Sequence, residues 1–285
     1  MENIREPAVA GAFYPSDPDV LSDDVMGYLQ KAEKEAIEGD VIALISPHAG
    51  YAYSGQVAAY AYKLVEGMDF DDVVVIAPSH RWPFEGVSVY HRGGFRTPLG
   101  LVPIDGGMCD QIMALDRRFR FIPEAHLGEH SLEVQLPFLQ VVLKGYKLVP
   151  IVVMGGANYE ICQSLGKAIA ESLGEKKVLI VASSDLTHSY NYRQVEEQDK
   201  LLANHIDQFS ITALEEDLRE ERCQACGEGP ILTAMIAAKT LGGDKGKVLH
   251  LTNSGDVTGD KRPGNYTVGY LAGVFYRTGS RKERS

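Results

Sequence analysis

The chain has 285 residues and a formal charge of −11, from 28 basic and 39 acidic side chains. A chain of this length buries roughly three quarters of its unfolded surface, so it needs no disulfide or structural metal in order to fold. The acidic balance excludes a broad nucleic-acid surface, which depends on clustered Lys and Arg. The longest apolar runs, at 73–77 and 148–154, are far shorter than the roughly 20 residues of a membrane span.

The N-terminus has no basic segment followed by an apolar stretch, as a secretory signal would have. We therefore expect a cytoplasmic protein with neither a membrane nor a nucleic-acid partner. In that compartment the four cysteines are expected to be thiols or metal ligands rather than structural disulfides.

Short β-branched runs alternate with segments of helical period along the chain. This pattern predicts a single α/β domain over residues 1–277, with a mostly parallel central sheet flanked by helices. Glycine and proline interruptions between residues 86 and 105 predict an inserted antiparallel hairpin at one edge. Residues 278–285 are expected to form a disordered tail. The expected strands are 41–46, 73–78, 148–154, 178–183, 248–252 and 267–276. The expected helices are 54–66, 106–115, 131–143, 159–173, 192–209, 210–219 and 230–241.

Three of the expected strands, the first, the second and the fourth, run into segments that carry histidine. The polar residues after these strands are His48, His80, Asp185 and His188. Ligands of open α/β sheets bind beyond the carboxyl ends of the strands. If these strands are parallel, the three histidines and the aspartate converge on one crevice.

Neutral imidazole binds iron, copper and zinc, and imidazoles held on rigid strand ends form a preorganised metal site. A strand followed by proline and histidine occurs twice, at His48 and at His80. The alternative is that each histidine only hydrogen-bonds a loop carbonyl. The repetition favours metal binding for this pair.

The pair Cys223 and Cys226 forms a CxxC motif, which occurs in zinc sites and in redox dithiols. A second CxxC, a nearby histidine pair and a preceding strand are all absent from the sequence pattern. Cys226 precedes an expected helix, whose N-terminus lowers the pKa of a thiol and favours thiolate ligation. A buried, inert thiol remains the alternative.

Two further motifs carry less weight. The segment Gly155-Gly156-Ala157-Asn158 matches neither G-x-G-x-x-G nor a P-loop, so we interpret it as a tight turn rather than a phosphate cradle. Ser183-Ser184-Asp185 with His188 is compatible with a hydrolase, but the G-x-S-x-G nucleophile elbow is absent.

Several unrelated motifs, in a fixed order over nearly the whole chain, resemble the Memo family. They lie at 7–15, 46–51, 78–80, 129–133, 183–188, 226–227 and 266–270. Members of that family resemble class III (LigB-type) extradiol dioxygenases, an α/β fold with a non-haem iron held by two histidines and a carboxylate. The resemblance implies His48 and His80 as the histidine ligands and Cys226 in place of the carboxylate.

The resemblance also implies that Asp185 and His188 line the same pocket, with His130 nearby. A His₂Cys set is softer than the dioxygenase triad and suits copper or zinc as well as Fe(II). The first hypothesis is therefore a mononuclear Fe(II)- or copper-dependent oxidoreductase in which His188, oriented by Asp185, moves protons and His130 is a further catalytic candidate. Partner proteins of the AMMECR and radical-SAM types are implied by the AmmeMemoRadiSam gene grouping.

A second hypothesis is a non-catalytic module that binds a peptide or small ligand in the same crevice. It rests on a cluster of aromatic and basic residues expected at the rim, namely Tyr14, Tyr51, Tyr53, Trp82, Tyr190, Tyr192 and Arg81. A third hypothesis is that Cys223 and Cys226 form a reversible disulfide that controls metal binding.

Overall fold

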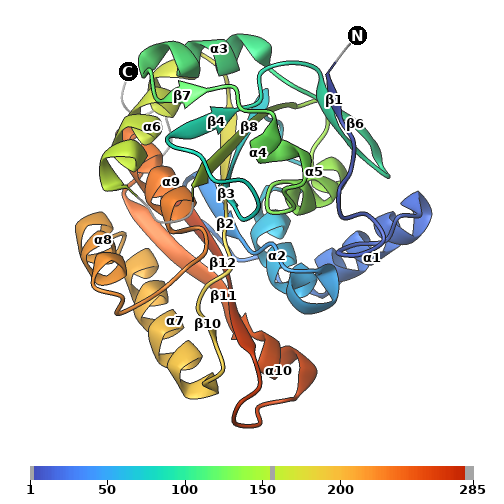
Figure 1. Ribbon diagram of the computed structural model, residues 1–285, viewed down its shortest axis with the longest axis vertical. Helices are drawn as coiled ribbons and strands as arrows, with labels where there is room; N and C mark the ends of the chain where they lie inside the picture. Colours follow the sequence, from blue (N-terminus) through green and yellow to red (C-terminus); the bar gives the residue numbers. More distant parts are fainter. Residues whose placement is uncertain (1–2, 155–157, 280–285) are drawn as a thin grey trace.

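The computed structural model describes residues 3–154 and 158–279 and shows a large mixed sheet with helices on both faces (Figure 1). The fold class is α/β, as the alternating sequence pattern predicts. Two sequence predictions concern other parts of the chain. The glycine turn at 155–157 lies outside the described residues, and so does the expected tail beyond residue 279.

Four parallel strands form the centre of the sheet, in the order β2 (Asp40–Ser46), β9 (Val178–Ser183), β3 (Asp72–Ser79) and β8 (Lys147–Met154). Nearly all of their residues are buried, because helices cover both faces of the sheet. Each strand lies within one residue of its expected bounds. Their carboxyl ends meet at one edge, with β9 between β2 and β3.

Antiparallel pairs complete the sheet on both sides. On one side β12 (Thr267–Arg277) pairs with β2, and β11 (Lys245–Asn253) and the short β10 (His188–Ser189) pair with β12. On the other side β4 (Val87–Val89) pairs antiparallel with β8, and β7 (Phe119–Arg120) runs parallel to β4.

The predicted hairpin is present as β5 (Gly94–Thr97) and β6 (Gly100–Pro103). It differs from the expectation in two respects. The hairpin forms a separate three-stranded sheet with β1 (Ile4–Arg5), and the preceding strand β4 belongs to the central sheet. This arrangement depends on pairing between β5 and the N-terminal strand β1, which are far apart in the sequence. The turn residues of the hairpin therefore could not predict it.

Two groups of helices cover the two faces of the sheet, each over its own hydrophobic core. The first group is α1 (Pro18–Lys31), α2 (Tyr51–Val65) and α5 (Leu136–Val142). The second group is α3 (Gly106–Leu115), α6 (Tyr159–Ser172), α7 (Tyr192–Asp207), α8 (Ile211–Arg219) and α9 (Glu228–Thr240). Short helices α4 (Glu124–Leu127) and α10 (Ser254–Thr258) lie in connections. Within the described residues, none of the helices has both the length and the apolar character of a membrane span.

Helix α1 was not predicted from the sequence, although its signals are ordinary ones. Asp17 caps its N-terminus by accepting from the amides of residues 19 and 20, and a proline occupies the first turn. Its buried stripe consists only of Leu21, Val25 and Leu29. Most of the other positions are polar or charged, so the apolar periodicity is narrow and easily overlooked.

Candidate metal centre

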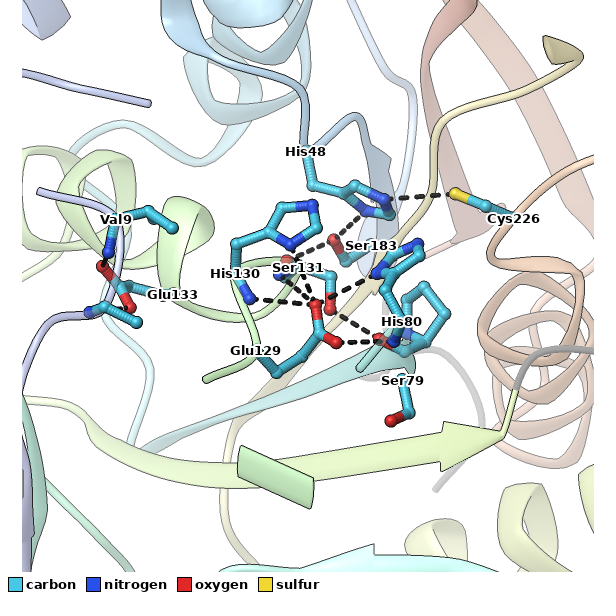
Figure 2. A network of polar contacts seen from close by, with 12 residues as sticks. Val9, His48, Ser79, His80, Glu129, His130, Ser131, Glu133, Ser183 and Cys226 are labelled. Atoms are coloured by element: carbon cyan, nitrogen blue, oxygen red, sulfur yellow. Dashed lines mark hydrogen bonds and ion pairs between the residues drawn. The ribbon is translucent and has the colours of Figure 1, made fainter. Parts of the chain in front are cut away.

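Two strand ends and the segment before α9 bring His48, His80 and Cys226 together (Figure 2). One potential ligand atom from each residue lies within 4.8 Å of the other two. His48 follows β2 and His80 follows β3, so the parallel directions of these strands place both imidazoles at the same edge of the sheet. The expected convergence of the three side chains is therefore observed.

The tautomer of His48 follows from the hydrogen bonds of Ser183, the last residue of β9. The Ser183 hydroxyl donates to the carbonyl of Ser131 (2.6 Å) and accepts from Nε2 of Gln135 (2.8 Å). A hydroxyl has only one proton to donate. His48 Nδ1, at 2.9 Å from Ser183 Oγ, must therefore be the donor in that contact. The lone pair of His48 consequently resides on Nε2, which faces the Cys226 Sγ at 3.1 Å.

His80 has the same tautomer for a different reason, its contact with Glu129. Nδ1 of His80 lies 3.0 Å from Oε1 of Glu129, and the backbone amide of His80 donates to Oε2 at 2.6 Å. Oε1 also accepts from the amides of His130 (2.9 Å) and Ser131 (3.0 Å). Burial alone would raise the pKa of Glu129, but the hydrogen bonds from His130, His80 and the backbone hold that pKa well below its usual range. The carboxylate is ionised and accepts from Nδ1, so Nε2 of His80 is free to bind a metal.

The thiol of Cys226 is protonated in the metal-free arrangement. Burial, reinforced by nearby Asp185, raises the pKa of Cys226 well above its usual value. Burial and the neighbouring imidazoles of His80 and His130 lower the pKa of His48 well below its ordinary value. The expected lowering of the Cys226 pKa by the helix N-terminus is therefore wrong, because desolvation outweighs the dipole. The remaining cysteines are also free thiols and are buried: Cys109, Cys162 and Cys223.

Asp185 and His188 lie beside this group but are not joined as expected. Oδ1 of Asp185 accepts from the backbone amides of His48 (2.7 Å) and Ala49 (3.3 Å), so this carboxyl supports the turn between β2 and α2. Nδ1 of the exposed His188 is 2.8 Å from the carbonyl of Leu186. The hydrogen bonds described for these two side chains thus give His188 a backbone partner in place of Asp185.

His130 packs on both candidate histidine ligands. Its ring stacks on His80 at a centroid distance of 4.9 Å and meets His48 edge-on at 5.5 Å. Its Nδ1 lies 3.1 Å from Oε1 of Glu129, and His80, Glu129 and His130 form a second group of potential ligands. Oε1 of Glu129 already accepts three hydrogen bonds and Oε2 accepts one, so this second group has fewer free donor atoms than the first.

The chemistry of the donors fits a metal ion at the first group. Two neutral imidazole nitrogens and a thiol suit iron, copper or zinc. Metal–ligand distances of about 2.0–2.3 Å place tetrahedral ligand atoms about 3.3–3.6 Å apart. The His48–Cys226 separation of 3.1 Å is near that spacing, and the ligand atoms of all three residues lie within 4.8 Å of one another.

The positions of Glu129 and His130 depend on a buried ion pair that sequence reasoning missed. Arg5 forms an ion pair with Glu133, and the two side chains are 1% and 0% exposed. Arg5 also donates from Nε to the His126 carbonyl at 3.0 Å and from Nη2 to the Glu129 carbonyl at 2.5 Å. The segment that carries Glu129 is thereby tied to β1, which lies 124 residues earlier in the sequence. In the sequence, the one indication of this ion pair was the motif at 129–133, which has an acidic residue at each end.

The expected aromatic rim is only partly present. Tyr14 and Tyr51 are buried and donate to Glu133 and to the Val134 carbonyl, respectively. These two rings belong to the core because their hydroxyls have interior partners. The exposed aromatic side chains of the proposed rim are Tyr53, Trp82 and Tyr190.

Replacement of the Glu129 carboxylate is expected to weaken metal binding. Glu129→Gln removes the charge that accepts from His80 Nδ1, so the imidazole loses basicity and its fixed tautomer. Loss of such a partner typically reduces metal affinity about 10–100-fold. Zn²⁺ titration against a chromophoric chelator measures the change, with Glu124→Gln, at an exposed position of α4, as the control. An unchanged affinity in a folded Glu129→Gln variant would contradict the assigned tautomer.

Comparison with known sequences agrees with the Memo family resemblance of the sequence motifs. The sequence model described as Memo-like protein matches residues 5–274. A MEMO1 family protein of Methanocaldococcus jannaschii is 37% identical over 96% of this chain and 99% of its own. A MEMO1 family protein of Aquifex aeolicus is 38% identical over 95% of this chain and 99% of its own. One of Nitrosopumilus maritimus is 35% identical over the same shares of the two chains. Because the family model and these relatives match nearly the whole chain, and the relatives are 35–38% identical to it, this chain belongs to the Memo family.

Proposed function

We propose that this protein binds one metal ion through Nε2 of His48, Nε2 of His80 and Sγ of Cys226. One observation supports this most strongly: both imidazoles use Nδ1 in internal hydrogen bonds and keep Nε2 free on the side where the thiol lies. The softness of this set favours Fe(II) or copper, and zinc also suits it.

The site is built to admit a ligand from one side. His48 is 2% exposed, whereas the His80 side chain is 31% exposed. Three protein donors leave part of the coordination sphere for a small molecule. A bound metal would supply Lewis acidity and, if it is iron or copper, a change of oxidation state.

The finer proposal is a metal-dependent oxidoreductase that acts on a small organic molecule held in this crevice. Nδ1 of His188 donates to a backbone carbonyl, so its Nε2 is available to accept a proton from the ligand. His130, which stacks on His80, is the second candidate for proton transfer. Asp185 contributes by holding the turn that carries His48.

Loss of a ligand is expected to abolish metal retention. His48→Ala removes a donor atom, and Cys226→Ser replaces the thiolate by a weakly binding hydroxyl. For each we expect a larger loss than the roughly 10–100-fold caused by removing a hydrogen-bond partner of a ligand. Metal analysis after purification without chelator, followed by Zn²⁺ titration, measures this. Cys223→Ala is the matched control, because Cys223 is a buried free thiol outside the ligand group. Parent-like metal content in either ligand variant would disprove the assigned set.

Metal binding is expected to release about one proton. The raised pKa of Cys226 keeps its thiol protonated at neutral pH, and the metal must displace that proton. The lowered pKa of His48 means that this ring is already neutral and releases none. Affinity should therefore rise about tenfold per pH unit near neutral pH, until the thiol itself titrates.

Calorimetric Zn²⁺ titrations in buffers of different ionisation enthalpy count the released protons directly. Cys226→Ser should reduce the count to near zero in this pH range. A count near zero for the parent protein would mean that the thiol is not a ligand or is already ionised.

Oxygen consumption distinguishes catalysis from binding alone. With the Fe(II)-loaded protein and a panel of catechols, His188→Ala is expected to lower turnover about 10²–10⁴-fold, the usual contribution of a general acid or base, with unchanged Zn²⁺ affinity. Absence of turnover by the folded, iron-loaded parent on the whole panel would favour the non-catalytic ligand-binding alternative. Equal turnover by parent and variant would remove His188 from the mechanism.

A further inference from the structure

Asp199 is a buried carboxyl group on α7, outside the residues discussed so far. The residue is 3% exposed, and α7 packs beside β10, β11 and β12 (Figure 1). Oδ1 of Asp199 accepts a hydrogen bond from the backbone amide of Thr187 at 3.1 Å. Thr187 directly precedes His188, so this helix contacts the segment that carries the proposed proton-transfer residue.

Gly269 on β12 provides the space that this carboxyl group occupies. A Cβ atom at position 269 would lie 1.7 Å from Oδ2 of Asp199 and 2.6 Å from its Cγ. A side chain at 269 therefore excludes the observed position of Asp199. The backbone φ of Gly269 is not in the left-handed region, so the need for glycine here is one of space.

The same glycine holds the backbone before His188. The amide of Leu186 donates to the Gly269 carbonyl at 2.8 Å, and the amide of Gly269 donates to the Thr187 carbonyl at 3.0 Å. Together with the Asp199 contact, these bonds fix the peptide groups of Leu186 and Thr187 from two directions. Strand β12 provides one support and helix α7 the other.

This fixed backbone decides the tautomer of His188. The Leu186 carbonyl lies 2.8 Å from Nδ1 of His188, and a carbonyl can only accept a hydrogen bond. Nδ1 must therefore carry the proton of the neutral imidazole, and Nε2 keeps its lone pair. If the peptide at 186–187 rotates, His188 loses the acceptor that selects this tautomer.

We infer that Asp199 is a positioning residue, which holds the Leu186–Thr187 backbone so that His188 keeps its proton on Nδ1 and leaves Nε2 unprotonated. The catalytic value of that tautomer rests on the proposed function, whereas the tautomer itself does not. Asp199 contacts neither the candidate metal ligands nor the imidazole. It acts through the one peptide group between Leu186 and Thr187, whose amide it accepts from and whose carbonyl faces Nδ1 of His188.

The chemistry of the carboxyl group is consistent with this role. Burial raises the pKa of Asp199 to about 7, so the group is costly to ionise where it lies. An oxygen of either the acid or the carboxylate accepts from the Thr187 amide. An asparagine keeps that acceptor, whereas a leucine of similar size fills the space and leaves a buried amide without a partner.

The test compares Asp199→Leu with the conservative Asp199→Asn, in the full chain without metal. The ¹⁵N chemical shifts of the ring nitrogens distinguish protonated from unprotonated nitrogen and report the tautomer of each histidine. The spectra are recorded above the titration range of histidine. His188→Gln assigns the signal among the eight histidines. Zn²⁺ titration of the same samples reports the metal site separately.

The parent and Asp199→Asn are expected to hold the proton of His188 on Nδ1, and Asp199→Leu is expected to lose that preference while its Zn²⁺ affinity stays within about twofold. A folded Asp199→Leu variant with the parent tautomer would overturn the inference. An Nε2-protonated His188 in the parent would overturn it even if the leucine variant does not fold. If the parent protein does not bind Zn²⁺, that result counts against the proposed metal site and leaves the tautomer result intact.

Discussion

The candidate metal centre depends on Glu129, a buried carboxylate whose two oxygens accept hydrogen bonds from His80 and from three backbone amides. An ionised carboxylate is tolerated in the interior only with such partners. In return, it fixes the imidazole of His80 with Nε2 free. The carbonyl of Glu129 is held in turn by Arg5, whose ion pair with Glu133 is fully buried. The N-terminal strand β1 is therefore part of the support of the site.

The two candidate histidine ligands have the same tautomer but different supports. His80 donates to an ionised carboxylate, which increases the basicity of its imidazole. His48 donates to the neutral hydroxyl of Ser183, which in turn donates to a backbone carbonyl. The ring that donates to the carboxylate is also the more exposed one. Within the candidate ligand group His80 therefore lies toward solvent, Cys226 is partly exposed and His48 is buried.

Backbone groups have a larger part in this site than the motifs indicate. Asp185 contacts the amides at the start of α2, and Asp199 contacts the amide of Thr187. His188 is oriented by a carbonyl group. Carboxyl side chains thus hold the turns, and the turns hold the imidazoles. Such an arrangement suits loops at strand ends, where main-chain groups lack sheet partners and need side-chain ones.

The sequence by itself determined the α/β class, the bounds of the central strands and the candidates His48 and His80. These features follow from local patterns, because a buried β-branched run predicts a strand wherever it occurs and parallel strands share one carboxyl edge. Cys226 was predicted as the third metal ligand only from the family resemblance, because it lies 178 residues from His48 in the sequence.

Only the tertiary structure decided the direction of β11 and β12, the sheet formed by the hairpin with β1, and the roles of Glu129, Ser183 and Asp199. Glu129 and His80 are 49 residues apart, and Ser183 and His48 are 135 residues apart. A hydrogen bond depends on distance and angle between two groups, and for groups so remote along the chain both are set by packing. Neither residue spacing nor composition contains that information.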